Sequence, residues 1–388
     1  MATRLLVKAG EHTRQQCPVS AEIETAGLDP ERLVLTTEDG SPIPCQVEQV
    51  GDKLRLSWVL DELAAKQEAV FLVGEGDAPD QAGVELSEKQ AGQIDVSLGG
   101  KLFASFCYGP PWSRPFLHPV IGPYGEPITR AFPVVKDVPG ESQDHPHHKS
   151  FWVAWGDVNG ADNWSENEKG HAHQVVRELT EAVSGPAFGR ISCALDWVSE
   201  AGEKQLEEDR ELVFHSLSKS CRAVDLKVVF RATEGKIRFG DTKEGGICSI
   251  RVATSMDAGD QGTIVNSYGG TNEAETWGKR AQWCDYYGPV AGKTVGIAIL
   301  DHPTNFRHPT YWHVRNYGLM TANPFGLSYF LGDKQMDGSH TLAAGEELTF
   351  RYRVLFHTDT TEEANVADKY NDYINPPVVS PPETEALT

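Results

Sequence analysis

Short runs of alternating apolar and polar residues, separated by turns rich in Gly, Pro and Asp, follow one another along most of the chain. Clear examples are residues 54–58, 93–98 and 348–356. Because successive side chains of a β-strand point to opposite faces of a sheet, this alternation predicts strands that bury one face. Only residues 360–374 have the apolar spacing of a helix. These features restrict the chain to an all-β fold.

The order of these runs predicts a small domain before a large one. Residues 1–78 contain short strands and no cluster of catalytic residue types, so we interpret them as an accessory β-sandwich. After a linker rich in Gly and acidic residues, residues 90–358 predict a large antiparallel β-sandwich. Residues 359–375 are predicted to form a C-terminal helix, and residues 376–388 a disordered tail.

The net charge limits the partners of the chain. Its 388 residues carry a formal net charge of −21, which argues against nucleic acid or an anionic membrane surface as partner. Acidity also serves plain solubility. A small molecule or a neutral oligosaccharide fits this charge better. No window approaches the length of a membrane span, and the oligomeric state stays open.

Cysteine usage and the first residues indicate the compartment. The seven cysteines are scattered and form no CxxC pair, so we expect reduced and mostly buried thiols rather than a disulfide framework. The first ten residues lack the apolar run of a signal peptide. We therefore expect a cytoplasmic protein.

The densest group of reactive side chains lies in residues 144–164, DHPHHKSFWVAWGDVNGADNW. Imidazole moves protons near neutral pH, so His147 and His148 are candidate general acids or bases. An indole face is a usual platform for a sugar ring, which makes Trp152 and Trp155 candidate substrate-binding residues. The alternative is that these histidines only hydrogen-bond a loop that packs on a sheet.

The histidines are also candidate metal ligands. His145 and His147 would project to one side of an extended segment, and His171 and His173 offer a second pair on one side of a strand. Against this, Pro146 interrupts a regular strand, and no HExxH spacing is present. We assign no cofactor, and a divalent metal stays an open alternative.

Acidic and basic side chains also gather in the glycine-rich segment 239–251. Asp241, Lys243 and Glu244 would converge in a turn, and such a set suits glycoside chemistry or proton abstraction beside a carbonyl. Arg251 in this segment, and the earlier Arg130, would bind substrate hydroxyls or a developing oxyanion. The alternative is a solvated turn with a weak ion pair.

Two His-Pro steps mark a third segment. His302 and His308 precede prolines, and Trp312 follows closely. Such steps can be purely architectural because proline extends the preceding residue, but both histidines are candidate acids or bases and Trp312 a further platform. If the three segments meet at one rim of the sandwich, they form a polar cleft with aromatic walls.

The three segments together carry a family resemblance. DHPHHKSFWVAWGDVNG, FGDTKEGG with Arg251, and the run WCDYYGP … DHPTNFRHPTYWHVRNYGLMTANPFG resemble, in order, blocks of the bacterial family labelled methane oxygenase PmoA. The resemblance covers most of residues 101–356. It implies a fold similar to the galactose-mutarotase-like supersandwich of epimerases, lyases and glycosidases. It carries no established catalytic residues.

From these residues and the resemblance we expect a soluble carbohydrate-active enzyme. It would cleave or isomerise a glycoside or an oxidised sugar by general acid/base chemistry. Two other functions remain open at this point. One is a non-catalytic sugar-binding protein on the same fold, and the other is a metal-dependent oxygenase, as the family label suggests.

Overall fold

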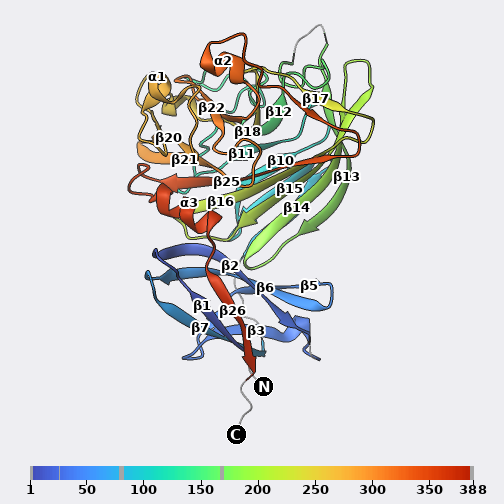
Figure 1. Ribbon diagram of the computed structural model, residues 1–388. Coiled ribbons are helices and arrows are strands. Elements are labelled where there is room, and N and C mark those ends of the chain that lie inside the picture. Colours follow the sequence, from blue (N-terminus) through green and yellow to red (C-terminus); the bar gives the residue numbers. More distant parts are fainter. Residues whose placement is uncertain (1–2, 26, 78–82, 167–169, 385–388) are drawn as a thin grey trace.

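The strands form two units that lie one above the other in the computed structural model, which describes residues 3–25, 27–77, 83–166 and 170–384 (Figure 1). The smaller unit contains a five-stranded and a three-stranded sheet. The first has the order β26 (Val378–Thr384), β1 (Thr3–Lys8), β7 (Glu68–Glu75), β3 (Leu33–Thr37) and β4 (Pro42–Ile43). The second has the order β2 (Arg14–Glu24), β6 (Lys53–Leu63) and β5 (Cys45–Val50).

Alternating side chains build the core of the small unit. Along β6, Leu54, Leu56, Trp58 and Leu60 are buried while the residues between them are more exposed. They pack with the inner residues of the facing sheet, such as Phe71, into a hydrophobic core separate from that of the large unit. The predicted small N-terminal β-sandwich is therefore confirmed.

The large unit consists of two eight-stranded antiparallel sheets. The first has the order β22 (Tyr311–Val314), β23 (Leu319–Asn323), β18 (Gly245–Arg251), β12 (Phe151–Trp155), β11 (Phe116–Val120), β10 (Lys101–Cys107), β9 (Gln93–Leu98) and β8 (Val84–Gln90). The second has the order β13 (His173–Val183), β14 (Phe188–Val198), β15 (Lys204–His215), β16 (Cys221–Arg231), β25 (Glu347–Thr358), β21 (Lys293–Asp301), β20 (Trp283–Val290) and β19 (Thr263–Asn266).

Aromatic side chains join the two large sheets. Phe103 of β10 contacts Phe214 of β15 and Phe356 of β25 edge-on, with ring centroids 6.2 and 5.5 Å apart. All three are fully buried, and each such side chain contributes about 1.5–3 kcal/mol through burial. The sheets thus face each other across one apolar core. This confirms the predicted large antiparallel β-sandwich.

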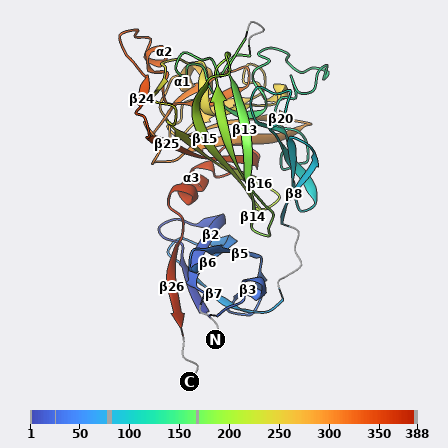
Figure 2. The same ribbon diagram turned by 90° about the vertical axis from the view of Figure 1, so that its right-hand side faces the viewer.

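Short elements complete the large unit, mostly at its end away from the small unit (Figures 1 and 2). They are β17 (Ile237–Phe239), β24 (His340–Leu342), α1 (Asn272–Thr276), α2 (Leu327–Leu331) and the 3-10 turn Thr254–Met256, while a second 3-10 turn, Pro30–Arg32, lies in the small unit. In the described part of the chain, no helix has the length and apolar character needed to cross a membrane.

Three predicted boundaries need correction. The C-terminal helix α3 (Val366–Ile374) begins later than predicted, after Asn365, because the left-handed backbone of Asn365, with φ of 53°, interrupts the helical turn before it. β8 precedes residue 90 and forms an edge of the large sandwich. The predicted disordered tail is wrong for residues 378–384, which pair with β1 as strand β26; residues 385–388 lie outside the described part.

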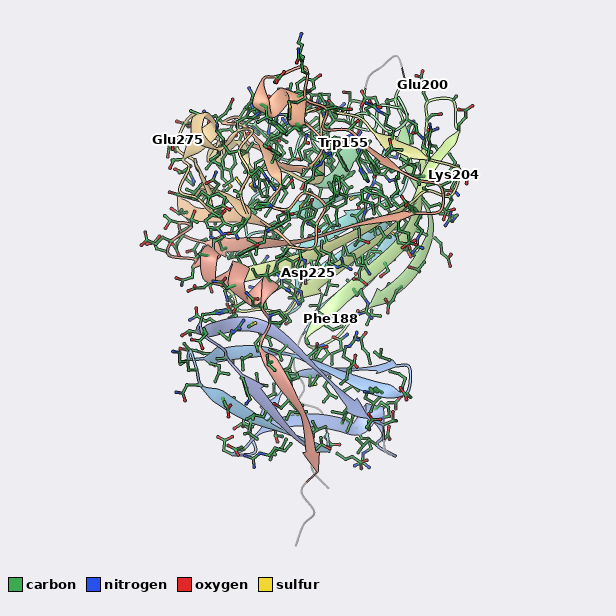
Figure 3. All side chains as sticks on the ribbon, in the orientation of Figure 1. Trp155, Phe188, Glu200, Lys204, Asp225 and Glu275 are labelled. Carbon is green, nitrogen blue, oxygen red and sulfur yellow. The ribbon has the colours of Figure 1, made fainter. Side chains whose placement is uncertain are left out.

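Polar contacts join the two units. Arg190 of β14 bonds to Glu48 of β5, and the backbone N–H of Phe188 donates to Gln46 at 3.2 Å. Figure 3 labels Phe188 at the end of the large sandwich that faces the small unit. A cavity of about 800 Å³ remains between the units, and Pro42, Val59, Lys219 and Arg222 are among the residues that line it.

Candidate functional site

Buried Arg130 holds the loop that carries the three histidines. Its Nη1 donates to the backbone oxygen and to Oδ1 of Asp144, at 2.7 and 2.5 Å. Its Nη2 donates to the backbone oxygens of His145 and His148, at 2.8 and 3.2 Å. The predicted role of Arg130 in substrate binding is therefore corrected, because this fully buried guanidinium is occupied by the loop itself.

Arg251, at the end of β18, is the second cation that bonds to this loop. Its Nη2 donates to Asp144 Oδ1 at 2.8 Å, and its Nη1 lies 3.2 Å from His148 Nδ1. Burial opposes ionisation of Asp144, but the charge of Arg251 and hydrogen bonds from His145 and Ser142 outweigh it and hold its pKa at about 2. Asp144 is therefore an ionised anchor at neutral pH.

A stack of four rings runs from the core toward the surface. Trp152, His148, His145 and Tyr317 follow one another with centroid distances of 5.4, 4.8 and 5.0 Å and nearly parallel planes. Burial, followed by neighbouring positive charge, keeps the pKa of His148 well below its usual value. His148 is thus a neutral packing residue. Trp152 is fully buried, so it is not the sugar platform that the sequence predicts.

His147 lies beside this stack and is not part of it. Its ring meets His148 edge-on at 4.4 Å and Trp164 at 5.9 Å. Burial and the positive charge of Arg114 lower the pKa of His147 to about 3, against smaller opposing effects of Glu166 and Glu244. His147 is therefore neutral near pH 7 and lies within electrostatic range of Glu244.

Asn323 fixes the turn that carries Lys243 and Glu244. Its fully buried amide donates to the backbone oxygens of Thr242, Lys243 and Gly245, at 3.1, 3.2 and 3.3 Å. The Glu244 carboxylate is 43% exposed and accepts a 2.5 Å bond from Lys243 Nζ. Partial burial raises the pKa of Glu244, but the bond and charge of Lys243 outweigh it and lower the pKa overall. The turn thus presents an ionised, accessible carboxylate.

His313 of β22 supplies a second imidazole beside this turn. Its Nδ1 lies 2.6 Å from the backbone oxygen of Lys243. Since a carbonyl only accepts, Nδ1 carries the hydrogen and Nε2 carries the lone pair. Nε2 is buried and has no hydrogen-bond partner among the described residues. Burial lowers the pKa of His313 to about 4, although the Lys243 carbonyl and Glu244 act in the opposite direction.

Aromatic and cationic side chains border the cluster. Tyr317 is half-buried, and the guanidiniums of Arg251 and Arg315 lie 4.8 and 5.5 Å from its ring centroid. Trp277, also partly exposed, meets His313 edge-on at 6.4 Å. Sequence reasoning did not select His313, Tyr317 or Trp277. The sequence signal that could have identified His313 and Tyr317 is their spacing: His313, Arg315 and Tyr317 occupy every second position at the polar end of an apolar strand.

We call His147, Lys243, Glu244, Arg251, His313, Arg315, Tyr317 and Trp277 the histidine–glutamate cluster. The first four are predicted site residues that the fold brings together, and they come from two of the three predicted segments. The third segment contributes through β22 and the turn after it rather than through the His-Pro steps.

The two His-Pro histidines have other partners. His308 Nδ1 lies 2.8 Å from Asp301 Oδ2, and the His302 ring packs against Tyr373 of α3 at 5.2 Å. Since α3 lies beside the small unit (Figure 1), His302 is directed away from the rim. The predicted catalytic role of both is corrected to a structural one.

Asp241 and two tryptophans are also structural. The Asp241 carboxylate accepts from the backbone N–H groups of Ser328 and Gly338, at 3.0 and 2.7 Å. Trp155, labelled in Figure 3, is fully buried and donates to Gly240, and Trp312 is fully buried and donates to Ala281. Their predicted roles in catalysis and sugar stacking are therefore wrong, because these side chains hold the fold together.

The candidate metal ligands do not gather around one point. His171 Nε2 lies 2.7 Å from Ser113 Oγ, and its ring packs near His173. His145 Nδ1 lies 2.9 Å from Asp144. Within residues 3–25, 27–77, 83–166 and 170–384, no three His, Cys, Asp or Glu side chains are placed to share a metal ion.

Two solved structures from Enterococcus faecalis resemble the chain at low identity. One is a protein in glycosyl hydrolase family 38, with 10% identity, a TM-score of 0.47, and coverage of 99% of this chain and 48% of that chain. The other is an α-mannosidase from strain V583, with 11% identity, a TM-score of 0.48, and coverage of 99% and 46%. The chain thus spans about half the length of either.

The comparison of sequences identifies the family of the chain. No curated protein matches the chain. A model of a family of unknown function, DUF6807, matches residues 93–371. The match includes every residue of the histidine–glutamate cluster and most of the large sandwich. The chain therefore belongs to the DUF6807 family.

Proposed function

We propose that this protein is a carbohydrate-active enzyme that performs general acid/base chemistry at the histidine–glutamate cluster. The observation that carries the proposal is the accessible, ionised carboxylate of Glu244, presented by a turn that the neutral, buried His313 contacts at the Lys243 carbonyl. His313 is buried, so it would act through its bond to the Lys243 carbonyl, which holds the turn that presents Glu244. Positioned carboxylates and imidazoles with shifted pKa values are common at catalytic sites.

The roles follow from the charge of each group. Glu244 would accept a proton from the substrate, and the buried His313 would position the turn of Lys243 and Glu244. Lys243 and Arg315 would stabilise negative charge that develops in the transition state. Tyr317 and Trp277 would take the platform role for the sugar ring, since both are partly exposed.

The test is turnover of a panel of monosaccharides and glycosides by Glu244→Gln and His313→Asn variants. The matched control is Glu68→Gln, because Glu68 pairs with Lys8 at 3.0 Å and is about as exposed as Glu244, but lies in the small unit. We expect kcat to fall at least about 100-fold in both site variants, with unchanged circular dichroism, and to stay near wild type in the control. Unchanged turnover in both site variants would remove the assignment.

One observation favours a second function, a non-catalytic sugar-binding protein. The ion pair with Lys243 lowers the basicity of Glu244, which suits a hydrogen-bond acceptor better than a strong base. Calorimetric binding of a sugar that chromatography then recovers unchanged would favour this function over catalysis.

A further inference from the structure

We infer that the substrate is an oxidised sugar, with a carbonyl or carboxyl group beside the reacting C–H bond, and that Glu244 removes that proton. This inference rests on the proposed function and narrows its substrate class. Its basis is the set of proton donors, acceptors and cations that the histidine–glutamate cluster and its anchor Asp144 provide.

The carboxylates of this region are poorly suited to glycoside hydrolysis. That reaction commonly needs two carboxyl groups, one of them protonated so that it can donate to the leaving oxygen. Asp144 accepts from two buried guanidiniums, and Glu244 accepts from Lys243. Since each is held by a cation, both are ionised, and neither can deliver that proton.

Asp257 is the other carboxyl group that could donate a proton to a leaving oxygen, because burial raises its pKa to about 6. The largest charges that act on it after burial are those of Arg251 and Asp144, not of Glu244. Its Oδ1 would lie 2.6 Å from a Cβ placed on Gly318, so it packs behind the turn that carries Tyr317. It is therefore a good control in the experiment below.

The cluster does suit proton abstraction beside a carbonyl. The C–H bond would break, its proton would pass to Glu244, and its electron pair would move onto the carbonyl oxygen as an enolate. When Glu244 becomes neutral, its pairing with Lys243 weakens, and the ammonium group becomes the counter-ion of the enolate. The total charge of the site is unchanged by this step.

The arginines on Tyr317 support a substrate with a polar, electron-rich group. Arg251 and Arg315 both lie against the Tyr317 ring, Arg251 paired with Asp144 and Arg315 with Glu273. The edge of this platform is therefore lined by charged, hydrogen-bonding groups. The neutral His147 adds a hydrogen-bonding group without adding charge. A carbonyl or carboxylate next to a hydroxylated ring matches this combination.

The experiment is exchange in D2O followed by proton NMR. The probes are a methyl hexuronide, a methyl keto-hexoside and the parent neutral methyl hexoside. We expect loss of the C–H signal beside the carbonyl or carboxyl group of at least one oxidised probe, and no change in the neutral one. The exchange rate should fall at least about 100-fold in Glu244→Gln and stay near wild type in Glu68→Gln and Asp257→Asn.

The outcomes separate this inference from the proposed function. Hydrolysis of the neutral hexoside without C–H exchange overturns the inference and leaves the proposed function standing, and loss of that hydrolysis in Asp257→Asn would identify the acid. Binding of oxidised sugars without exchange also overturns the inference. If no probe is bound and none is turned over, both the inference and the proposed function are overturned.

Discussion

The charge of three histidines is set by burial more than by neighbouring carboxylates. Burial lowers the pKa of His118 to about 4, of His147 to about 3 and of His313 to about 4. These side chains come from three different strands or loops, so the effect belongs to each local environment. Near pH 7 all three imidazoles are neutral, which is the form that accepts a proton or a hydrogen bond.

Acidification should therefore destabilise the fold before carboxylates are protonated. An unfolded histidine binds a proton near pH 6.5, while the folded one resists it until about pH 4, so stability falls as pH decreases through this window. Each such histidine contributes about 1.4 kcal/mol per pH unit. Urea unfolding at pH 7, 6 and 5 measures the slope, which should be shallower in His118→Gln; an identical slope in variant and wild type would contradict the assignment.

The sequence identifies several residues of the candidate site, but it does not show which side chains are exposed. His147, Lys243, Glu244 and Arg251 are predicted site residues that the fold brings together. Trp152 is not exposed because β12, FWVAW, is buried on both faces, and its uninterrupted apolar run was the available signal. The role of His313 depends on a bond to a carbonyl 70 residues away in sequence, which no local pattern contains.

At the scale of elements, the turn before β18 is held by side chains on both of its ends. Asn323 holds the backbone around Lys243, and Asp241 connects the turn to α2 and to Gly338. Glu244 is thus placed by buried hydrogen bonds rather than by its own ion pair. This rigidity suits a site that must keep a carboxylate beside an imidazole.

We predict that Asp241→Ala lowers the free energy of unfolding by about 1–3 kcal/mol, because two backbone N–H groups lose their acceptor. Asp333→Ala is the matched control, since Asp333 accepts from Gln335 in an exposed turn, and its loss should cost well under 1 kcal/mol. Urea unfolding compares the two. Equal stabilities of the two variants would show that Asp241 does not hold the turn.

At the scale of the whole molecule, the alternating pattern predicts the two sandwiches but not how the chain ends are paired. β26 returns from the large unit to extend the sheet of the small unit, with Val7 opposite Val379. A pairing across more than 370 residues has no local signal. Its physical basis is the open backbone edge of β1, which β26 covers.

A chain that stops after Asn375 should therefore expose the edge of β1. We predict a lower Tm for the small unit and a larger mass in solution, because an open edge pairs with other chains. The control is a chain that ends at Thr384, which keeps β26. Thermal unfolding and light scattering after size exclusion measure both effects, and identical values for the two chains would contradict the role of β26.

We propose that segments far apart in the sequence form one sugar site at the end of the large sandwich away from the small unit. The most direct measurement is a crystal structure with an oxidised sugar bound. We expect the sugar within hydrogen-bonding distance of Glu244, beside Tyr317. Sugar found only elsewhere, such as in the cavity of about 800 Å³ between the two units, would contradict it.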